Sequence, residues 1–285
     1  MTNHMHEANR ISWNRATSQH HTHRPDLIEK YRSGWNNLYP EEIALLGDIK
    51  GKNLVHLQCN DGQDTLSIAK HLGALVTGVD ISDTAIEFAR RLSAEADIPA
   101  TFIRSDLFAW FDTNITEYDV VFTSYGALNW LSDIKKWGQG VAKSLKSGGH
   151  FAMMEFHPFM TMHISPDEDN GAWILSSDYM GGKPIIEEWG VGDYVGEAGN
   201  TRDEAIARGT FQNPDPSYEF AWGVADIVTA LLEAGLTLTH LQEFPYCNGW
   251  RPFENMRQDD DYRNYPPENM PQLIPLMLGI RAIKR

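Results

Sequence analysis

Three things are scarce in this chain: cysteine, positive charge and long apolar runs. Its 285 residues contain only two cysteines, Cys59 and Cys247, which argues against a disulfide framework and fits a reducing cytosol. The 24 lysines and arginines face 39 aspartates and glutamates, and this net charge of −15 argues against nucleic acid or an anionic membrane as a partner. No apolar run reaches the ~18 residues of a membrane helix, and the N-terminal sequence MTNHMHEANR lacks the apolar centre of a secretion signal. We therefore expect a cytoplasmic protein, monomeric or homodimeric.

Apolar residues make up 42% of the chain, enough to bury one sizeable core. Residues 1–36 are polar and rich in His, Asn and Arg, so we expect an N-terminal arm or lid with one or two short helices. Residues 37–285 then form the main domain. Many aromatics among glycines and acids predict an inserted β-rich flap at about 160–215, because linkers carry few aromatics, and a surface excursion at 247–272.

The most informative segment, Asn53 to Ser82, predicts a β-α-β unit. A short apolar run at 54–57 suits a strand buried on both faces. A turn follows at 60–62, because Asn and Gly tolerate positive φ, and apolar residues then recur at helical spacing. The second strand ends at Asp80. Ligands of open α/β sheets bind at the carboxyl ends of the strands, and a carboxylate there can accept hydrogen bonds from both hydroxyls of a ribose. We therefore expect a ligand that contains a nucleoside.

The turn between the first strand and its helix also limits the choice of nucleoside. A dinucleotide site needs a glycine-rich turn for its pyrophosphate, but only Gly62 is a glycine here, and Asp61 and Asp64 add negative charge. S-adenosylmethionine carries no phosphate and suits such a turn. Two alternatives stay open: a nicotinamide dehydrogenase, which shares the β-α-β unit and Asp80, and a β-α-β unit without any ligand.

The remaining elements extend an α/β pattern. We expect helices that begin at Pro40 and after Ser82, and a helix through Trp137, Val141 and Leu145 that Gly148 and Gly149 end. Further strands are expected at 101–103, 120–122, 151–155, 236–244 and 274–283, with a helix at about 224–232. No helix separates the last two strands, so they are most easily antiparallel.

The chain resembles a class I S-adenosylmethionine-dependent methyltransferase. It is similar in particular to a bacterial and fungal small-molecule subgroup with the motif HLQC-x-x-G-x-DTLS. The matching pieces are VHLQCNDGQDTLS (55–67), VTGVDIS (76–82), FTSYGALNWLSD (122–133), SGGHFAMMEFHP (147–158), SYEFAWGVADIVTALLEAGL (217–236), LIPLMLGIRAIKR (273–285) and, in the arm, SWNRATSQHHTHRPD (12–26). The resemblance implies a Rossmann-like fold: a mostly parallel seven-stranded sheet with helices on both faces and an antiparallel C-terminal strand pair.

The resemblance also implies site residues. Asp80 would bind the ribose, with Ile81 packing on the adenine, and Asp106 would accept from the adenine amino group beside Ser105 and Leu107. The methionine and ribose part of the cofactor would be lined by Gln58, Cys59, Asn60 and Gly62, with Ser124 and Tyr125 near the methionine tail. The more widespread family pattern has an acidic residue at His56 and glycines at Gln58 and Asn60. Tyr31 or Arg32 of the arm would then supply part of the grip on the tail.

Two loci could supply a general base where the acceptor loses a proton. Glu155 and His157 follow the expected fifth strand, at the carboxyl edge, and His157 has a suitable intrinsic pKa. Alternatively His157 binds backbone at the strand end and Glu155 acts through other residues. The second locus is the histidine cluster at 20–23, where a folded arm would lend His20 or His23 to the site. Adjacent histidines point apart and no cysteine is near, so we predict no metal site there, and a disordered polar arm is the alternative.

Several aromatic residues could clamp a flat or cationic small molecule, although core packing is the simpler reading for each: Tyr125, Trp130, Trp173, Trp189, Tyr218 and Trp222. A cofactor-binding protein of this fold without methyl transfer is a further alternative.

Overall fold

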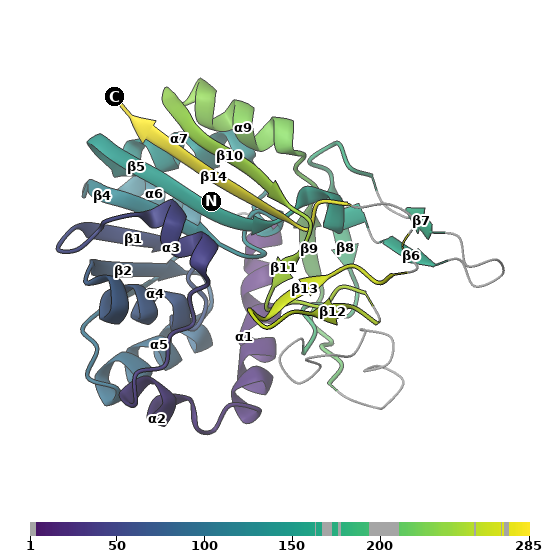
Figure 1. Ribbon diagram of the computed structural model, residues 1–285, viewed down its shortest axis with the longest axis horizontal. Helices are drawn as coiled ribbons and strands as arrows, with labels where there is room; N and C mark the ends of the chain where they lie inside the picture. The colour runs from purple at the N-terminus through teal and green to yellow at the C-terminus, as the bar shows by residue number, and fades with distance from the viewer. Residues whose placement is uncertain are drawn as a thin grey trace.

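The computed structural model describes residues 4–162, 164–166, 173–175, 178–193, 211–253, 255–268, 270 and 274–285. Its centre is a seven-stranded sheet in the order β10-β14-β5-β4-β1-β2-β3 (Figure 1). Strands β5, β4, β1, β2 and β3 pair in parallel, whereas β14 is antiparallel to both β5 and β10. The expected fold class, with an antiparallel pair at the C-terminus, is therefore confirmed.

The strands of this sheet are β1 (Asn53–Leu57), β2 (Leu75–Asp80), β3 (Thr101–Arg104), β4 (Tyr118–Ser124), β5 (Leu145–Phe156), β10 (Leu236–Phe244) and β14 (Met277–Lys284). The α-helices are α1 (His4–Thr22), α2 (Leu27–Arg32), α3 (Pro40–Leu46), α4 (Gln63–Ser67), α5 (Asp83–Glu95), α6 (Leu107–Thr113), α7 (Ile134–Ser144) and α9 (Val224–Glu233). Three shorter helical segments are η1 (Ile68–Leu72), a π-helical continuation of α4, and the 3₁₀ turns η2 (Leu128–Trp130) and η3 (Pro158–Met162).

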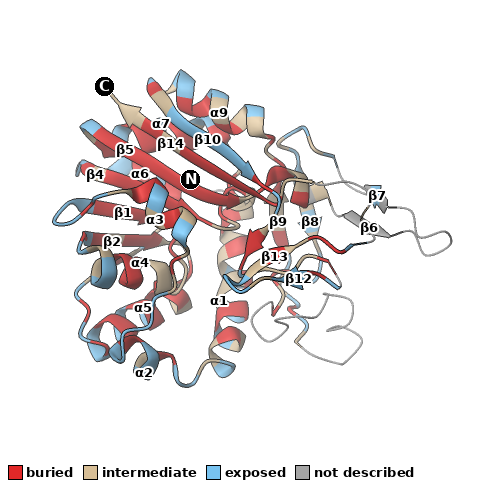
Figure 2. Cartoon of the chain, viewed as in Figure 1, coloured by how far each residue is buried: buried red, intermediate tan, exposed pale blue. Residues whose placement is uncertain are grey.

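Helices cover both faces of the sheet. Apolar residues of α6, α7 and α9 pack on one face, and those of α3, η1, α4 and α5 pack on the other. The inner strands β1, β4, β5 and β14 are largely buried, whereas the edge strands β10 and β3 are partly exposed (Figure 2). Ser82 caps α5 by accepting a hydrogen bond from Ala85 N at 3.1 Å, as the sequence predicts. This packing leaves the carboxyl edge of the parallel strands as the place where polar side chains gather.

Three expectations about single elements are wrong. Leu145 does not end a helix, because its backbone is already extended and it opens β5, so Gly148 and Gly149 lie inside a strand. The arm holds a 19-residue helix, α1, rather than short helices only. The sequence pattern also predicted no helix after β3, but α6 forms there with Asp106 as its N-cap.

Smaller sheets lie beside the carboxyl edge. In the flap region, β6 (Ile164–Pro166) pairs with β7 (Trp173–Leu175), and β8 (Pro184–Glu187) pairs with β9 (Ser217–Phe220). In the excursion, β11 (Cys247–Asn248), β12 (Arg257–Gln258) and β13 (Arg263–Tyr265) form a three-stranded sheet. Helix α1 runs between the central sheet and these small sheets (Figure 1). Both cysteines are buried and free.

Candidate functional site

The turn after β1 is tight although it holds one glycine. Gln58 and Asn60 adopt positive φ of 55° and 49°, and Gly62 has φ of 81°. A Cβ at Gly62 would lie 2.7 Å from the Phe102 ring, so no side chain fits there. The other two positions reach the left-handed region without glycine, which is less common but sterically allowed. The turn therefore keeps its shape while presenting two amide side chains to the carboxyl edge.

Asp80 organises the ends of β1 and β2. One carboxylate oxygen accepts from Asn60 N and the other from Ser82 N, both at 2.8 Å. Burial raises the pKa of Asp80 to about 6, and these backbone donors oppose the shift. Each oxygen has two lone pairs, so both can still accept from a ligand hydroxyl. The carboxylate is thus fixed in place with free acceptor capacity at the sheet edge.

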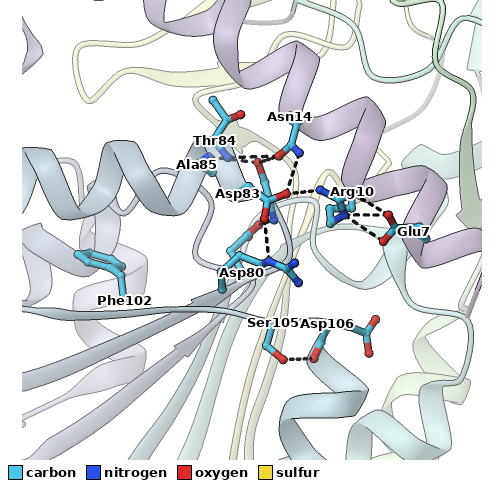
Figure 3. Close-up of polar contacts among 12 residues, drawn as sticks. Glu7, Arg10, Asn14, Asp80, Asp83, Thr84, Ala85, Phe102, Ser105 and Asp106 are labelled. Carbon is cyan, nitrogen blue, oxygen red and sulfur yellow. Dashed lines mark hydrogen bonds and ion pairs between the residues drawn. The ribbon is translucent and has the colours of Figure 1, made fainter. Parts of the chain in front are cut away.

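Asp106 stands at the end of β3 and meets a residue of the N-terminal helix. Its Oδ1 accepts from Ala109 N at 2.9 Å, and its Oδ2 lies 2.6 Å from His6 Nδ1. Ser132 N donates to the other ring nitrogen of His6, Nε2, at 3.2 Å. Because Nε2 accepts, the ring proton lies on Nδ1 and is donated to Asp106. Figure 3 shows Asp106 beside Ser105, whose hydroxyl donates to the Asp106 carbonyl at 2.9 Å.

His56 belongs to a buried chain of hydrogen bonds that ends at Asp64. Ser124 Oγ donates to Asp64 Oδ2 at 3.0 Å, so its oxygen accepts from His56 Nε2, also at 3.0 Å. The other ring nitrogen, Nδ1, then accepts from Thr65 Oγ at 2.8 Å. Burial lowers the pKa of His56 to about 3, so the ring is neutral. Asp64 receives a further bond from Asn37 Nδ2 at 2.6 Å. This chain ties β1, β4 and the first turn of α4 together.

Glu155, at the end of β5, holds the loop after β4. Its carboxylate accepts from the backbone N–H of Gly126, from Ala127 N at 2.8 Å, from Leu128 N at 3.1 Å and from Phe156 N at 2.8 Å. Gln58 braces the same loop, since its Nε2 donates to Ala127 O at 2.7 Å. Burial raises the pKa of Glu155, while four backbone donors favour its charged form. The geometry is that of a residue that positions a loop.

Helix α1 lies against the carboxyl edge of the sheet at β2 and β3 (Figure 3). Asn14 Oδ1 accepts from Ser82 Oγ at 2.8 Å and from Thr84 N at 3.2 Å, and Asn14 Nδ2 donates to Asp83 Oδ2 at 2.9 Å. Arg10 forms an ion pair with the same aspartate. Further along the helix, His21 stacks on the Phe88 ring with centroids 3.6 Å apart. One helix therefore touches the chain that follows β2 and, through His6, the chain that follows β3.

The opposite side of α1 holds the flap. Asn9 exchanges two hydrogen bonds with the backbone of Tyr218 in β9, at 2.7 and 2.8 Å, much as a neighbouring strand would. Ser12 Oγ accepts from Val191 N at 2.9 Å and from Asn213 Nδ2 at 3.0 Å. The helix is thus a polar layer between the carboxyl edge of the sheet and the flap. It has one buried apolar residue, Ala16, against several buried polar ones: His6, Asn9, Ser12, Thr17 and His20.

The predicted histidines lie at the margins of this arrangement. His157 is buried, its Nδ1 accepts from Phe159 N at 3.1 Å, and its Nε2 therefore donates to Glu243 Oε1 at 2.9 Å. Burial lowers the pKa of His157, and Glu243 opposes the shift. Both ring nitrogens are thus engaged within the protein. His20 Nε2 lies 3.1 Å from Gly192 O, and His23 Nε2 lies 2.8 Å from Asp193 Oδ2, so both contact the flap.

The other predicted residues fall into two groups. Cys59, Leu107 and Ser124 are buried at the carboxyl ends of strands β1, β3 and β4, with Ile81 and Ser105 half-buried beside them. Tyr125 follows β4, and its hydroxyl accepts from Asn248 Nδ2 at 3.1 Å. Tyr31 lies further away in the core: its hydroxyl donates to Gln63 O at 2.8 Å, which supports the start of α4.

The predicted aromatic clamp is not one cluster. Trp222 is fixed by a bond from its Nε1 to Leu131 O, Trp130 stacks edge-on against Trp13, and Trp189 is 53% exposed. The side chain of Trp173 lies outside the described residues. Within the described ranges, no group of three or more His, Cys, Asp or Glu side chains is arranged to hold a metal ion, and no helix is long and apolar enough to span a bilayer.

Sequence reasoning missed several residues of the site. His6, Asn9 and Asn14 look like solvated residues of a polar arm, and no periodic apolar face marks their helix as buried. Glu42 looks like an acidic residue in the first turn of a helix, yet its side chain is fully buried. The sequence did contain a sign that Asp64 belongs to the site: it is the second acid, after Asp61, next to the turn that follows β1, and burying an acid there is costly unless it is hydrogen-bonded.

Known proteins share this architecture. Residues 55–149 match the model of the methyltransferase domain family. The ubiquinone biosynthesis O-methyltransferase of Vibrio cholerae is 35% identical over 100 residues, which are 35% of this chain and 40% of that protein. The chain thus matches less than half the length of these curated relatives.

Two solved structures resemble the whole fold. An S-adenosylmethionine dependent methyltransferase from Mesorhizobium loti has a TM-score of 0.52 at 21% identity, covering 86% of this chain and 96% of that one. The geranyl diphosphate C-methyltransferase from Streptomyces coelicolor A3(2) has a TM-score of 0.51 at 11% identity, with coverage of 86% and 77%. The chain therefore has the Rossmann-like fold of the class I methyltransferases.

Proposed function

We propose that this chain transfers a methyl group from S-adenosylmethionine to a small-molecule acceptor. One arrangement carries the proposal: Asp80 and Asp106 stand at the ends of the adjacent parallel strands β2 and β3, beside a turn with a single glycine. The first carboxylate suits ribose hydroxyls and the second suits an adenine amino group, while the acidic turn disfavours a diphosphate. The methyltransferase fold and the family match of residues 55–149 support the same assignment.

The residues present fit this cofactor. Gln58 Oε1 is a buried acceptor without a partner among the described residues, on the turn where the methionine tail would lie, and an ammonium group would supply its missing donor. When bound, the cofactor supplies a methyl group on a positively charged sulfur. We assign its methionine and ribose part to Gln58, Cys59, Asn60, Gly62, Asp80, Ser124 and Tyr125, and its adenine to Ile81, Ser105, Asp106 and Leu107. We also place the chain in the small-molecule subgroup with the HLQC-x-x-G-x-DTLS motif.

The chain's own residues would act mainly by positioning. Alignment of reacting groups can lower a barrier by ~7–11 kcal/mol. Glu155 fixes the backbone of residues 126–128 next to the site, and we assign it to positioning rather than to proton transfer. His157 has no free ring nitrogen, so we assign it to the structure of the β5 end. We assign His20 and His23 to joining α1 with the flap, because their ring nitrogens contact Gly192 and Asp193.

We further propose that residues 1–36 act as a lid on the main domain at 37–285. Helix α1 contacts the chain after β2 and β3 on one side and the flap on the other. A layer in this place excludes water from the site once cofactor and acceptor are bound. Helix α1 buries one apolar side chain, Ala16, and is otherwise held by hydrogen bonds and by ring contacts of His6, Trp13 and His21, which suits a segment that must release product.

Calorimetric titration with S-adenosylhomocysteine and, separately, with NAD tests the proposed function. We expect binding of the first at micromolar or lower dissociation constant and no measurable binding of the second. Binding of NAD instead would favour a nicotinamide enzyme. Binding of S-adenosylhomocysteine without methyl transfer to any acceptor in a broad small-molecule screen would leave a cofactor-binding protein of this fold.

A further inference from the structure

Two buried carboxylates without a counter-ion lie near the first turns of α3 and α4. Glu42 is fully buried: its Oε2 accepts from Tyr39 N at 2.6 Å, and its Oε1 has no hydrogen-bond partner among the described residues. Asp64 accepts only from neutral donors, Asn37 and Ser124. Within the described part of the chain, neither carboxylate forms a salt bridge.

The pKa shifts of Glu42 and its neighbour Glu41 show that the ionised form of Glu42 is unfavourable in this environment. Burial, and then the charge of Asp64, raise the pKa of Glu42 well above its ordinary value, although the Tyr39 backbone N–H and the Tyr125 hydroxyl oppose the shift. The adjacent residue, Glu41, shows the contrast: its own backbone N–H, the Tyr246 hydroxyl and Arg263, whose Nη2 lies 2.7 Å from Oε1, together lower its pKa against burial. A buried acid without such a partner is destabilising unless something else supplies the positive charge.

Asn248 provides an independent second sign of a missing donor. It is 1% exposed, and its Nδ2 donates to Glu41 Oε2 at 3.3 Å and to Tyr125 Oη at 3.1 Å. A carboxylate only accepts, so the amide nitrogen must face Glu41 and the amide cannot be flipped. Among the described residues, its Oδ1 is then left buried without a partner. The Tyr125 hydroxyl also favours the charged form of Glu42. Glu42 Oε1 and Asn248 Oδ1 therefore belong to two side chains that both interact with the Tyr125 hydroxyl.

Aromatic rings border the same place. The rings of Tyr39 and Tyr125 meet edge-on with centroids 6.4 Å apart, Tyr125 lies 5.3 Å from Phe156, and Phe156 lies 4.6 Å from Trp250. Aromatic faces attract cations and pack against flat apolar groups. Acceptor oxygens, an uncompensated carboxylate and aromatic rings together match one kind of group, an ammonium on an apolar body.

We propose that this cluster, Tyr39, Glu42, Tyr125, Phe156, Asn248 and Trp250, binds the methyl acceptor, and that the acceptor carries a protonated amine on an apolar or aromatic body. The inference rests on the proposed methyl transfer and names its substrate class. The ammonium is an anchor: a nitrogen that keeps its proton has no lone pair for the methyl group, so the methylated atom is another atom of the molecule.

The ammonium group of the cofactor is the alternative partner for the Glu42 carboxylate. We assign that group to Gln58, because the turn after β1 carries its own unsatisfied acceptor oxygen. Glu42 and Asn248 belong instead to α3 and to the excursion, which lie outside the β1–β2–β3 edge that fits the nucleoside. Tyr125, which we also assign to the cofactor, contacts Asn248 and would lie between the two ligands. The two occupants can be separated by experiment.

The test is calorimetry on the full chain saturated with S-adenosylhomocysteine, titrated with benzylamine and with benzyl alcohol. We expect benzylamine to bind at least about tenfold more tightly, since a hydrogen bond to a charged group is worth ~1.5–3 kcal/mol. Glu42→Gln should remove this preference, and Asn248→Leu should weaken it several-fold. Glu95→Gln makes the same charge change at an exposed residue and should leave the preference intact. Circular dichroism confirms that each variant is folded.

Three outcomes would overturn the inference. The first is equal affinity for the amine and the alcohol in the unsubstituted protein while S-adenosylhomocysteine binds normally. The second is an unchanged preference for the amine in both Glu42→Gln and Asn248→Leu. The third is a loss of S-adenosylhomocysteine affinity in Glu42→Gln without a loss for 5′-methylthioadenosine, which lacks the ammonium, because Glu42 would then serve the cofactor. Failure of S-adenosylhomocysteine to bind the unsubstituted protein would instead refute the proposed function itself.

Discussion

His6 and Asp106 are 100 positions apart in the sequence and share a hydrogen bond of 2.6 Å. The histidine is 3% exposed and receives Ser132 N on its second nitrogen, so it connects three segments of the carboxyl edge. A carboxylate that is held on one side by a fixed donor is preorganised to accept from a ligand on the other side. The N-terminal helix therefore contacts the carboxylate that we propose for the adenine.

Replacing His6 with alanine should weaken S-adenosylhomocysteine binding several-fold and leave the main domain folded. The change removes one charge-assisted hydrogen bond, worth ~1.5–3 kcal/mol, and part of the docking of α1. Calorimetry gives the affinity, and Arg15→Ala serves as a control because Arg15 is half exposed and contacts only Asp215 among the described partners. Equal affinity in the His6 variant and the control would contradict the idea.

Asp80→Ala should lower the affinity for S-adenosylhomocysteine by at least about tenfold, and more than Asp106→Ala does. Asp80 would accept two ribose hydroxyls in charge-assisted bonds, whereas Asp106 would accept a single bond from the adenine amino group. Both variants are compared by calorimetry with the unsubstituted protein. The assignment of the nucleoside edge fails if the Asp80 variant binds normally, and the adenine must lie elsewhere if the Asp106 variant does.

The affinity for S-adenosylhomocysteine should rise with pH and level off above about pH 6. The pKa of Asp80 is raised from 3.8 to about 6 in the folded protein, so the group binds its proton more tightly when folded than when unfolded. Its contribution to the free energy of unfolding is therefore full below about pH 3.8 and is lost as the pH rises through 6. Ribose binding needs the ionised form, so affinity should fall about tenfold per pH unit below the pKa.

The control for this pH dependence is Asp80→Asn, which cannot ionise. Its weaker binding of S-adenosylhomocysteine should be nearly independent of pH over the same range. The melting temperature of the variant, relative to that of the unsubstituted protein, should increase as the pH rises. A parallel pH dependence in both proteins would assign the titration to another group.

His157→Gln should leave kcat nearly unchanged and lower the melting temperature by a few degrees. Both ring nitrogens of His157 are engaged by Phe159 and Glu243, so no nitrogen is available to take a proton from an acceptor. Kinetics with any identified acceptor, together with thermal denaturation, would check this. A loss of kcat by ~10²-fold at constant cofactor affinity would restore His157 as a general base.

Deleting residues 1–24 should leave a folded domain with strongly reduced turnover. Helix α1 contributes one apolar residue to the core, Ala16, but it joins the nucleoside edge to the flap. Circular dichroism and thermal denaturation report the fold, and methyl transfer reports the site. Full turnover in the truncated protein would mean that the helix has no part in closing the site.

The sheet was predictable because its strands are apolar and its turns are marked. The sequence correctly predicts strands β1 and β2, which end at Leu57 and Asp80, and Ser82 as the N-cap of α5, because buried strands and helix caps depend on local sequence. Leu145 was misplaced because an apolar residue at helical spacing also suits the start of a buried strand. Helix α6 was missed because LFAWF is apolar on all sides and shows no helical periodicity.

The site was predictable where it depends on strand ends and unpredictable where it depends on distant contacts. Asp80 was proposed from the rule that ligands bind at the carboxyl edge, and Asp106 from the family resemblance; the structure shows that both stand at the ends of adjacent strands. The burial of His6, Asn9 and Glu42 comes from tertiary packing, such as the pairing of Asn9 with Tyr218 across 209 positions, and no local pattern encodes it. Glu155 was identified as a site residue, but only the structure shows that its oxygens face the backbone of 126–128.

The polar character of α1 also has a consequence for biosynthesis. The helix is synthesised well before its partners Asp106, Val191 and Tyr218, which lie about 100 to 210 positions further along the chain. An apolar helix in this position would expose hydrophobic surface until its partners are synthesised, and this exposure would promote aggregation. A helix whose buried face consists of histidine, asparagine, serine and threonine can remain solvated until the flap is complete. The last native contacts to form would then be those that close the site.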